Sequence, residues 1–232
     1  MLLFLLKITF MDLVDRFQIP ILQEIALRNP QSTALGQKII EGSILLIDHL
    51  GFEQFTFKKL AQKISTTEAS IYRYFASKQK LLLYLVNWYW GRLECRLHLQ
   101  TQGGTPKERL QKALELILIP PLSSEALNIE KPLQRIVIHE ASKVFLTKAV
   151  DQDHQTGYHL IYTEIVQYIA DLVLAYQPRC DYPQMLVSTL LEGSQLQRFF
   201  EQHLPEVTNT SLNEDAVNEF YIKLIFSYLD NE

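Results

Sequence analysis

The commoner enzyme motifs are missing from this sequence of 232 residues. It contains no G-x-S-x-G nucleophile turn, no phosphate-binding P-loop, no dinucleotide glycine fingerprint and no H-E-x-x-H metal motif. His139 stands beside Glu140, but no third ligand lies at a suggestive spacing from them. We therefore expect a protein that is not an enzyme, with no catalytic residue, no metal site and no cofactor.

Cysteine and long apolar runs are also scarce. Cys95 and Cys180 have no metal-ligand or redox spacing, so we expect reduced thiols in a cytoplasmic protein. The opening MLLFLLKITF is too short to span a bilayer, and it lacks a basic start and a small-residue cleavage site. It is either a segment that packs on the body or upstream sequence ahead of a natural start at Met11. We expect no membrane partner.

The balance of charge differs along the chain. The formal net charge is −4, and residues 1–37 contain three basic and three acidic side chains. Residues 38–92 contain eight Lys and Arg against four Asp and Glu, so the remainder carries −8. A hydrophobic fraction of 47% suits a sizeable core, and a charged fraction of 21% argues against disorder. The chain therefore joins a basic module to an acidic one.

Three helix starts follow one another within residues 52–82. Thr56, Thr67 and Ser77 each precede a helical pattern, and their hydroxyls can cap it. Such close spacing leaves little room for strands. The stretch predicts a helix-turn-helix followed by a longer helix that ends near Gln100.

Lysines occupy the first turn of two of these helices. Lys58 and Lys59 begin one helix, and Lys78 and Lys80 begin another. The helix dipole favours carboxylates there, so exposed cations cost roughly a few tenths of a kcal/mol each. A phosphate bound between the free backbone amides and the ammonium groups accounts for this arrangement. The pattern therefore indicates a nucleic-acid partner.

Residues 56–82 contain the pattern T-x-x-x-L-A followed by T-x-x-S-I-Y-R-Y-F-x-S-K-x-x-L-L. This pattern resembles the DNA-binding domain of the TetR (tetracycline-repressor) family of bacterial transcriptional regulators, and the resemblance covers about residues 36–86. Two departures are Ser65, where the family usually has a glycine and which predicts a less tight turn, and Gln79, where an acidic residue is common. The family spacing is kept at Tyr72, Phe75, Ser77, Lys78 and Leu81.

The resemblance implies a role in binding double-stranded DNA for nine residues. Arg73 is the best candidate for a guanine contact, and Glu68 is suited to accept a hydrogen bond from a cytosine amine. Glu68 has a second interpretation as a solvated helix residue. Tyr72 has a second interpretation as a packing residue. The implied phosphate contacts are Thr56, Tyr72, Tyr74 and Lys78, and the implied base-edge positions are Lys58, Glu68, Ala69, Ser70 and Arg73.

Helical periodicity continues to the end of the chain, so the predicted fold class is all-α. We expect an N-terminal extension at residues 1–33 with a possible helix at 12–28, a helix-turn-helix domain at 34–84, and a helical regulatory and dimerisation domain at 85–232. The helices expected outside the helix-turn-helix span about 34–50, 78–100, 106–118, 130–148, 158–176, 182–203 and 212–229.

The last two expected helices carry more apolar residues than one core face needs. This surplus predicts packing against a second copy, and the TetR resemblance implies a homodimer through these helices. The alternative is that both faces are buried within one subunit. Because one short recognition helix reaches only a few base pairs, a dimer predicts a palindromic operator.

Regulation is inferred from the resemblance alone. It implies a repressor that a small apolar or aromatic effector releases, and the candidate ligand contacts are Trp88, His139, Tyr158 and Tyr162. Each of these has a second interpretation as an ordinary core or surface residue. The alternative function is a helical adaptor or carrier that retains a vestigial helix-turn-helix.

Overall fold

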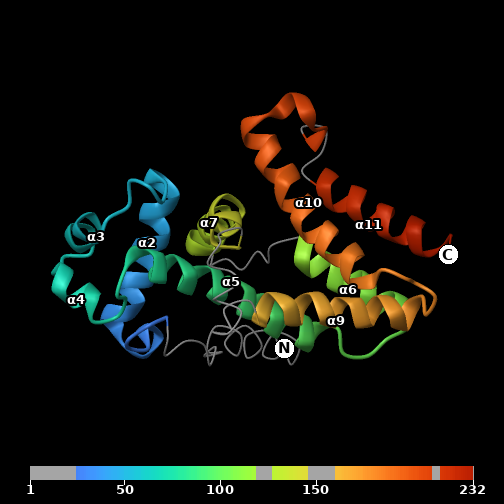
Figure 1. Cartoon of the computed structure of the whole chain (residues 1–232), viewed down its shortest axis with the longest axis horizontal. Coiled ribbons are helices and arrows are strands. Elements are labelled where there is room, and N and C mark those ends of the chain that lie inside the picture. The colour runs from blue at the N-terminus through green and yellow to red at the C-terminus, as the bar shows by residue number, and fades with distance from the viewer. Residues whose placement is uncertain (1–24, 119–126, 146–159, 211–214, 232) are drawn as a thin grey trace, which may run out of the picture. The chain divides into compact units, whose positions relative to one another are not determined.

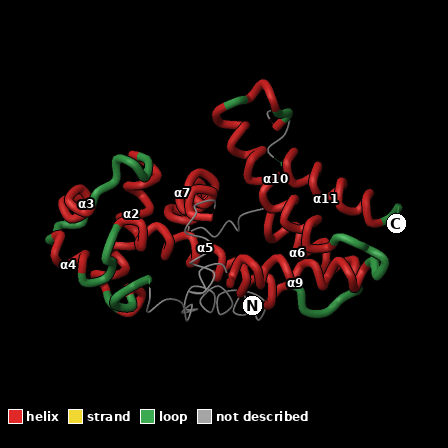
Figure 2. Tube along the Cα trace, viewed as in Figure 1, coloured by secondary structure: helices red, strands yellow, loops and turns green. Residues whose placement is uncertain are grey.

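The computed structural model describes residues 25–118, 127–145, 160–210 and 215–231. Within these ranges all regular structure is helical, and Figure 2 shows helices and loops but no strand. The prediction of an all-α fold is therefore confirmed. The described helices include none that is long and apolar enough to cross a membrane.

The chain divides into two compact units (Figure 1). The first contains residues 1–92 and 122–158, and the second contains residues 93–121 and 159–232. The boundary between Arg92 and Leu93 falls within one helix, α5 (Lys78–Gln100), which contributes residues to both units. The described helices of the first unit are η1 (Pro30–Ser32), α2 (Ala34–Leu50), α3 (Phe57–Lys63), α4 (Glu68–Tyr72) and α7 (Leu127–Phe145), and those of the second are α6 (Pro106–Leu118), α9 (Leu160–Tyr176), α10 (Pro183–His203), η3 (Pro205–Val207) and α11 (Ala216–Leu229).

Helix α2 has the bounds of about 34–50 that the sequence predicts, and it is capped at both ends. The Thr33 hydroxyl accepts a hydrogen bond from the Gly36 amide at its start, and Gly51 ends it with a φ of 77°. One face is fully buried, including Ile39 and Ile44. Helix α7 packs on α2, and the Arg135 guanidinium donates two hydrogen bonds of 2.7 Å to the Asp48 carboxylate. This bidentate pair ties the two helices together within the first unit.

The N-terminal prediction of a helix at 12–28 lies mostly outside the described residues. Its described end is not helical, because residues 25–28 form a turn and a bend before η1. Ile25 and Ala26 are nevertheless buried. Residues 25–28 are therefore not helical, and Ile25 and Ala26 are buried in the first unit.

The second unit is built on α9, α10, α6 and α11. Helix α9 packs on both α10 and α6, and α11 packs on α10 and α6. Helix α9 contains apolar residues at most positions, but only one face is buried, for example at Ile165 and Ile169, while Glu164 and Asp171 are exposed. Helix α9 is therefore amphipathic.

The turn between α3 and α4 is a Schellman motif. The Thr66 amide donates to the Ala61 carbonyl over 2.9 Å, and the Ser65 amide donates to the Gln62 carbonyl over 3.4 Å. Ser65 has a φ of 55°, which is the left-handed region that favours glycine. Ser65 therefore closes the turn in the conformation a glycine would adopt, and the looser turn predicted from the sequence is not observed.

Replacing Ser65 with glycine should stabilise this turn. The left-handed conformation costs a residue with a Cβ roughly 1 to 2 kcal/mol, and the more flexible unfolded chain offsets about 0.4 to 1 kcal/mol of the gain. We expect Ser65→Gly to raise the free energy of local opening by about 0.5 to 1 kcal/mol. Amide hydrogen exchange of peptides spanning residues 57–75 measures this energy.

The matched variant is Ser65→Val, in which a β-branched side chain is forced into the same conformation. It should lower the opening free energy of the same peptides. An unchanged or lower value for Ser65→Gly would show that the turn is not strained.

Candidate nucleic-acid interface

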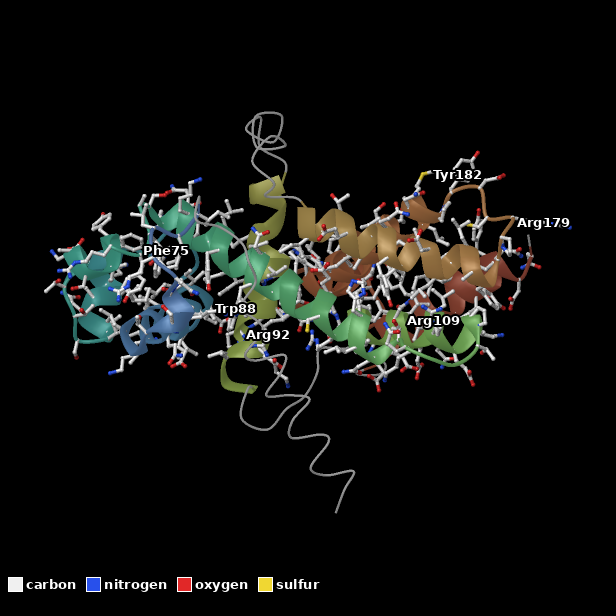
Figure 3. The ribbon with its side chains drawn as sticks, turned by 90° about the horizontal axis from the view of Figure 1, so that it is seen from below. Phe75, Trp88, Arg92, Arg109, Arg179 and Tyr182 are labelled. Carbon is white, nitrogen blue, oxygen red and sulfur yellow. The ribbon has the colours of Figure 1, made fainter. Side chains whose placement is uncertain are left out.

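Buried apolar side chains hold the two short helices in place. Leu60 on α3 and Ile71 on α4 are completely buried, as are Phe55 before α3 and Phe75 after α4. The Phe75 ring lies edge-on to the Tyr84 ring of α5, with centroids 5.3 Å apart, and Figure 3 marks Phe75 at this end of α5. The orientation of α3 and α4 is therefore set by the core of the first unit.

Hydroxyl caps begin both helices, as the sequence predicts. The Thr56 hydroxyl accepts from the Lys59 amide, and the Thr67 hydroxyl accepts from the Ser70 amide, each over 3.2 Å. The Ser77 hydroxyl accepts from the Lys80 amide over 3.2 Å at the start of α5. Each cap satisfies a backbone amide that the helix itself leaves without a partner.

The side chains that these helices leave in solvent include most of the residues predicted to contact DNA, and we call this set of residues the recognition face. It combines basic, acidic, hydroxyl and aromatic groups on two adjacent helices. Ser70 borders this face, is only partly exposed, and its hydroxyl lies 2.9 Å from that of Thr67. The exposed members are Thr56, Lys58, Glu68, Ala69, Tyr72 and Arg73.

Tyr72 combines packing with exposure. Its ring lies edge-on to the Phe57 ring at a centroid distance of 5.0 Å, yet 49% of the residue surface is exposed. Arg73 follows as the C-cap of α4 and is also exposed. Both side chains are therefore placed where an external partner can reach them.

Tyr74 is not part of this face. It is 3% exposed, and its hydroxyl lies 2.7 Å from the hydroxyl of Thr33, the N-cap of α2. The phosphate contact predicted for Tyr74 does not fit this position, because the phenol is buried and already has a partner. Its role in the structure is to join the end of α4 to the start of α2.

Two lysines have partners inside the protein. The Lys78 ammonium donates to the carbonyls of Phe52 and Glu53 over 3.1 and 3.2 Å, and it lies 4.7 Å from the centroid of the Phe52 ring. The Lys59 ammonium donates to the Gln54 carbonyl over 2.8 Å. These carbonyls explain why a cation follows each cap. The positions of Lys59 and Lys78 therefore do not require an external phosphate. Lys58 remains exposed on the recognition face.

The predicted effector residues fall in different parts of the chain. Trp88 is 9% exposed on α5, and the Arg92 guanidinium lies 5.0 Å from its ring centroid (Figure 3). His139 is partly exposed on α7 of the same unit. Tyr162 belongs to the second unit, where its hydroxyl donates to Glu192 over 2.8 Å, and Tyr158 lies outside the described residues. Of the described candidates, Trp88 and His139 therefore belong to the first unit and Tyr162 to the second.

A hollow of about 270 Å³ lies elsewhere in the second unit, between α10, η3 and α11. The hydroxyl of Thr210, one of its lining residues, is buried and has no hydrogen-bond partner among the described residues. Aromatic rings of Phe220 and Tyr221 line another side. The sequence does not predict this hollow, because its walls come from three elements brought together by the packing of α10 on α11.

A pair of carboxyl groups lies between α5 and α9 within the second unit. Burial, and then the neighbouring charge of Glu164, raise the pKa of Glu94 to about 7. His98 Nε2 lies 3.9 Å from the Glu94 carboxylate, and the His98 ring contacts the ring of Tyr168. The described residues contain no group of three side chains placed to hold a metal ion.

Comparison with known proteins agrees with the geometry of the first unit. Residues 39–85 match the family model described as bacterial regulatory proteins of the tetR family. The uncharacterized HTH-type transcriptional regulator YuxN of Bacillus subtilis (strain 168) is 29% identical over 80 residues, which are 34% of this chain and 28% of YuxN.

Solved structures extend the likeness to most of the fold. A TetR-like transcriptional regulator from Rhodococcus sp. RHA1 matches with a TM-score of 0.57 and 15% identity, over 84% of this chain and 96% of that one. The ketosteroid transcriptional regulator KstR2 of Mycobacterium tuberculosis matches with a TM-score of 0.56 and 15% identity, over 83% and 93%. A protein from Saccharomonospora viridis, described as a transcriptional regulator in complex with choline, matches with a TM-score of 0.56 and 21% identity, over 82% and 94%.

The chain therefore carries a TetR-family helix-turn-helix within the fold of TetR-like regulators. The family match lies in the helix-turn-helix, and the matches to solved structures concern the fold of most of the chain.

Removing the Lys78 ammonium should destabilise the helix-turn-helix even without DNA. Hydrogen bonds to a charged donor typically contribute about 1.5 to 3 kcal/mol, and we expect a loss at the lower end for Lys78→Ala because its side chain is partly exposed. Urea denaturation monitored by amide exchange of residues 52–60 measures the loss.

Lys58→Ala is the matched control, because Lys58 lies in the same helix-turn-helix but its side chain is exposed. The free energy of unfolding of this variant should differ from that of the wild type by less than about 0.5 kcal/mol. Equal stability of the two variants would contradict the assignment of Lys78 to the carbonyls.

Proposed function

We propose that the protein is a repressor that binds a short palindromic operator as a homodimer and is released by a small apolar or aromatic effector. The recognition face is the observation that supports DNA binding most strongly. It presents Arg73 and Lys58 to solvent on two short helices whose orientation is set by a buried core. A helix-turn-helix reads DNA through such a face in the major groove.

Base contacts in this proposal come from Arg73, Lys58 and Glu68. An arginine fork fits the O6 and N7 atoms of guanine, and a carboxylate can accept from the amine of cytosine. Tyr72 and Thr56 supply hydroxyls to phosphates. Glu68 lies in the first turn of α4, where a carboxylate also favours the helix dipole.

The proposed dimer interface is the outer face of α10 and α11. Phe220, Leu224 and Tyr228 recur every four residues along α11, and they are 58%, 48% and 36% exposed. Met185 and Leu196 of α10 are 58% and 50% exposed. An apolar stripe of this kind supports contact with a second copy, and burial of both faces within one subunit fits these exposures poorly.

The proposed effector is a small apolar or aromatic molecule. The choline in the complex of the Saccharomonospora viridis protein shows that a protein of this fold accommodates a small molecule. In this chain the aromatic candidates Trp88 and Tyr162, with His139, support an apolar or aromatic ligand.

Selection of bound sequences from a random duplex library tests the proposal as a whole. A repressor of this kind should enrich a two-fold symmetric site whose half-sites are separated by about one turn of B-DNA or a multiple. Absence of any salt-dependent affinity for duplex DNA would instead favour the helical adaptor.

Truncating Arg73 should reduce the preference for the selected site. Loss of a bidentate guanine contact costs about 1 to 3 kcal/mol on that site, and the effect on random duplex should be much smaller. Fluorescence anisotropy with both duplexes measures the two affinities.

The matched variant is Lys63→Ala, which removes an exposed cation from α3 outside the recognition face. It should leave the ratio of the two affinities unchanged. Equal losses on both duplexes for Arg73→Ala would refute base readout by this residue.

A charge placed in the apolar stripe should dissociate the dimer. Leu224→Glu introduces a carboxylate where the proposal buries a leucine, and a charge buried without a partner is strongly unfavourable. Sedimentation velocity should show a monomer for Leu224→Glu at concentrations where the wild type is a dimer.

Lys223→Glu is the control, because it changes the charge of the neighbouring exposed residue without removing an apolar one. It should remain dimeric. A dimeric Leu224→Glu would place the interface on another surface.

A further inference from the structure

The segment before α2 is attached to the end of α4. The Leu27 amide donates to the Tyr74 carbonyl over 2.9 Å, just after α4 ends. Ile25 and Ala26 are 1% and 7% exposed, so the segment is anchored by burial as well as by this hydrogen bond. The position of residues 25–28 is therefore coupled to α4, although they stand far from it in the sequence.

This attachment places one cation beside the recognition face. Arg28 is exposed, and its guanidinium carbon lies 5.5 Å from the centroid of the Tyr74 ring. Tyr74 follows Arg73 directly, and Arg73 is the exposed C-cap of α4. Among the described side chains, no carboxylate lies within ion-pair distance of Arg28. Its charge therefore faces solvent next to the helix that carries the base contacts.

The contact with the Tyr74 ring leaves this guanidinium able to bind an anion. A guanidinium that lies over an aromatic ring uses its face for that contact, while its N–H donors point outward from the edge. Those donors fit two oxygens of a phosphate. The ring also restricts the side chain before DNA binds, which lowers the entropy lost on contact.

A major-groove helix is flanked by phosphates, so a cation held at its end reaches the backbone more readily than the base edges. We propose that Arg28 binds a DNA phosphate, and that the segment 25–28 is a built part of the DNA-binding surface. This inference rests on the proposed DNA binding. It adds a contact outside residues 39–85, the part that matches the family model.

Salt dependence of the affinity for a fluorescein-labelled random duplex tests the inference. Each phosphate contact contributes about 0.9 to the slope of log K against log salt, so Arg28→Gln should make the slope of a dimer shallower by about 1.8. Arg28→Lys should keep the wild-type slope because it keeps the charge. Figure 3 marks Arg179, an exposed arginine between α9 and α10, and Arg179→Gln should also keep it.

The outcomes separate this inference from the proposed function. A wild type without salt-dependent binding contradicts DNA binding itself. A wild type that binds, with an Arg28→Gln slope equal to its own, contradicts only the role of Arg28. If Arg28→Lys loses as much slope as Arg28→Gln, the residue acts through the position of Tyr74 rather than through its charge, and the inference is also overturned.

Discussion

Helix α4 is too short to be stable alone, and contacts with the rest of the first unit stabilise it. Helix α4 has five residues, whereas an isolated helix shorter than about 12 to 15 residues is marginal in water. Its geometry therefore depends on Ile71 and Phe75, both completely buried, and on the cap at Thr67. The buried residues on one side of α4 therefore determine which side chains its other side presents to solvent.

The same dependence explains the roles of the polar residues around α4. The Tyr74 ring is buried and its hydroxyl is hydrogen-bonded to the Thr33 hydroxyl, so Tyr74 connects the end of α4 to the start of α2. Lys78 donates to carbonyls of the loop before α3. Tyr74 and Lys78 therefore stabilise the positions of α3 and α4 through internal contacts, whereas Arg73 and Lys58 remain exposed on the recognition face.

Local signals in the sequence predict the helices well. Thr33, Thr56, Thr67 and Ser77 are capping residues whose hydrogen bonds reach only three residues ahead, so nearby sequence is enough to locate the helix starts. The end of α2 at Gly51 follows for the same reason. The exposed members of the recognition face also follow from the family pattern.

Long-range contacts are what the sequence could not reveal. The partner of Tyr74 is 41 residues away, and the carbonyl partners of Lys78 are 25 and 26 residues away. Helical spacing alone does not distinguish a tyrosine that faces DNA from one that faces Thr33. The hollow beside α11 and the coupling of Leu27 to Tyr74 depend on tertiary packing in the same way.

Amide hydrogen exchange with and without duplex DNA tests the central claim most directly, namely that a short helix held by the core of the first unit is the DNA-binding element. The account predicts that DNA slows exchange in peptides covering residues 56–73 and leaves α9 and α11 unchanged. Slower exchange in α9 or α11 with no change at residues 56–73 would contradict it.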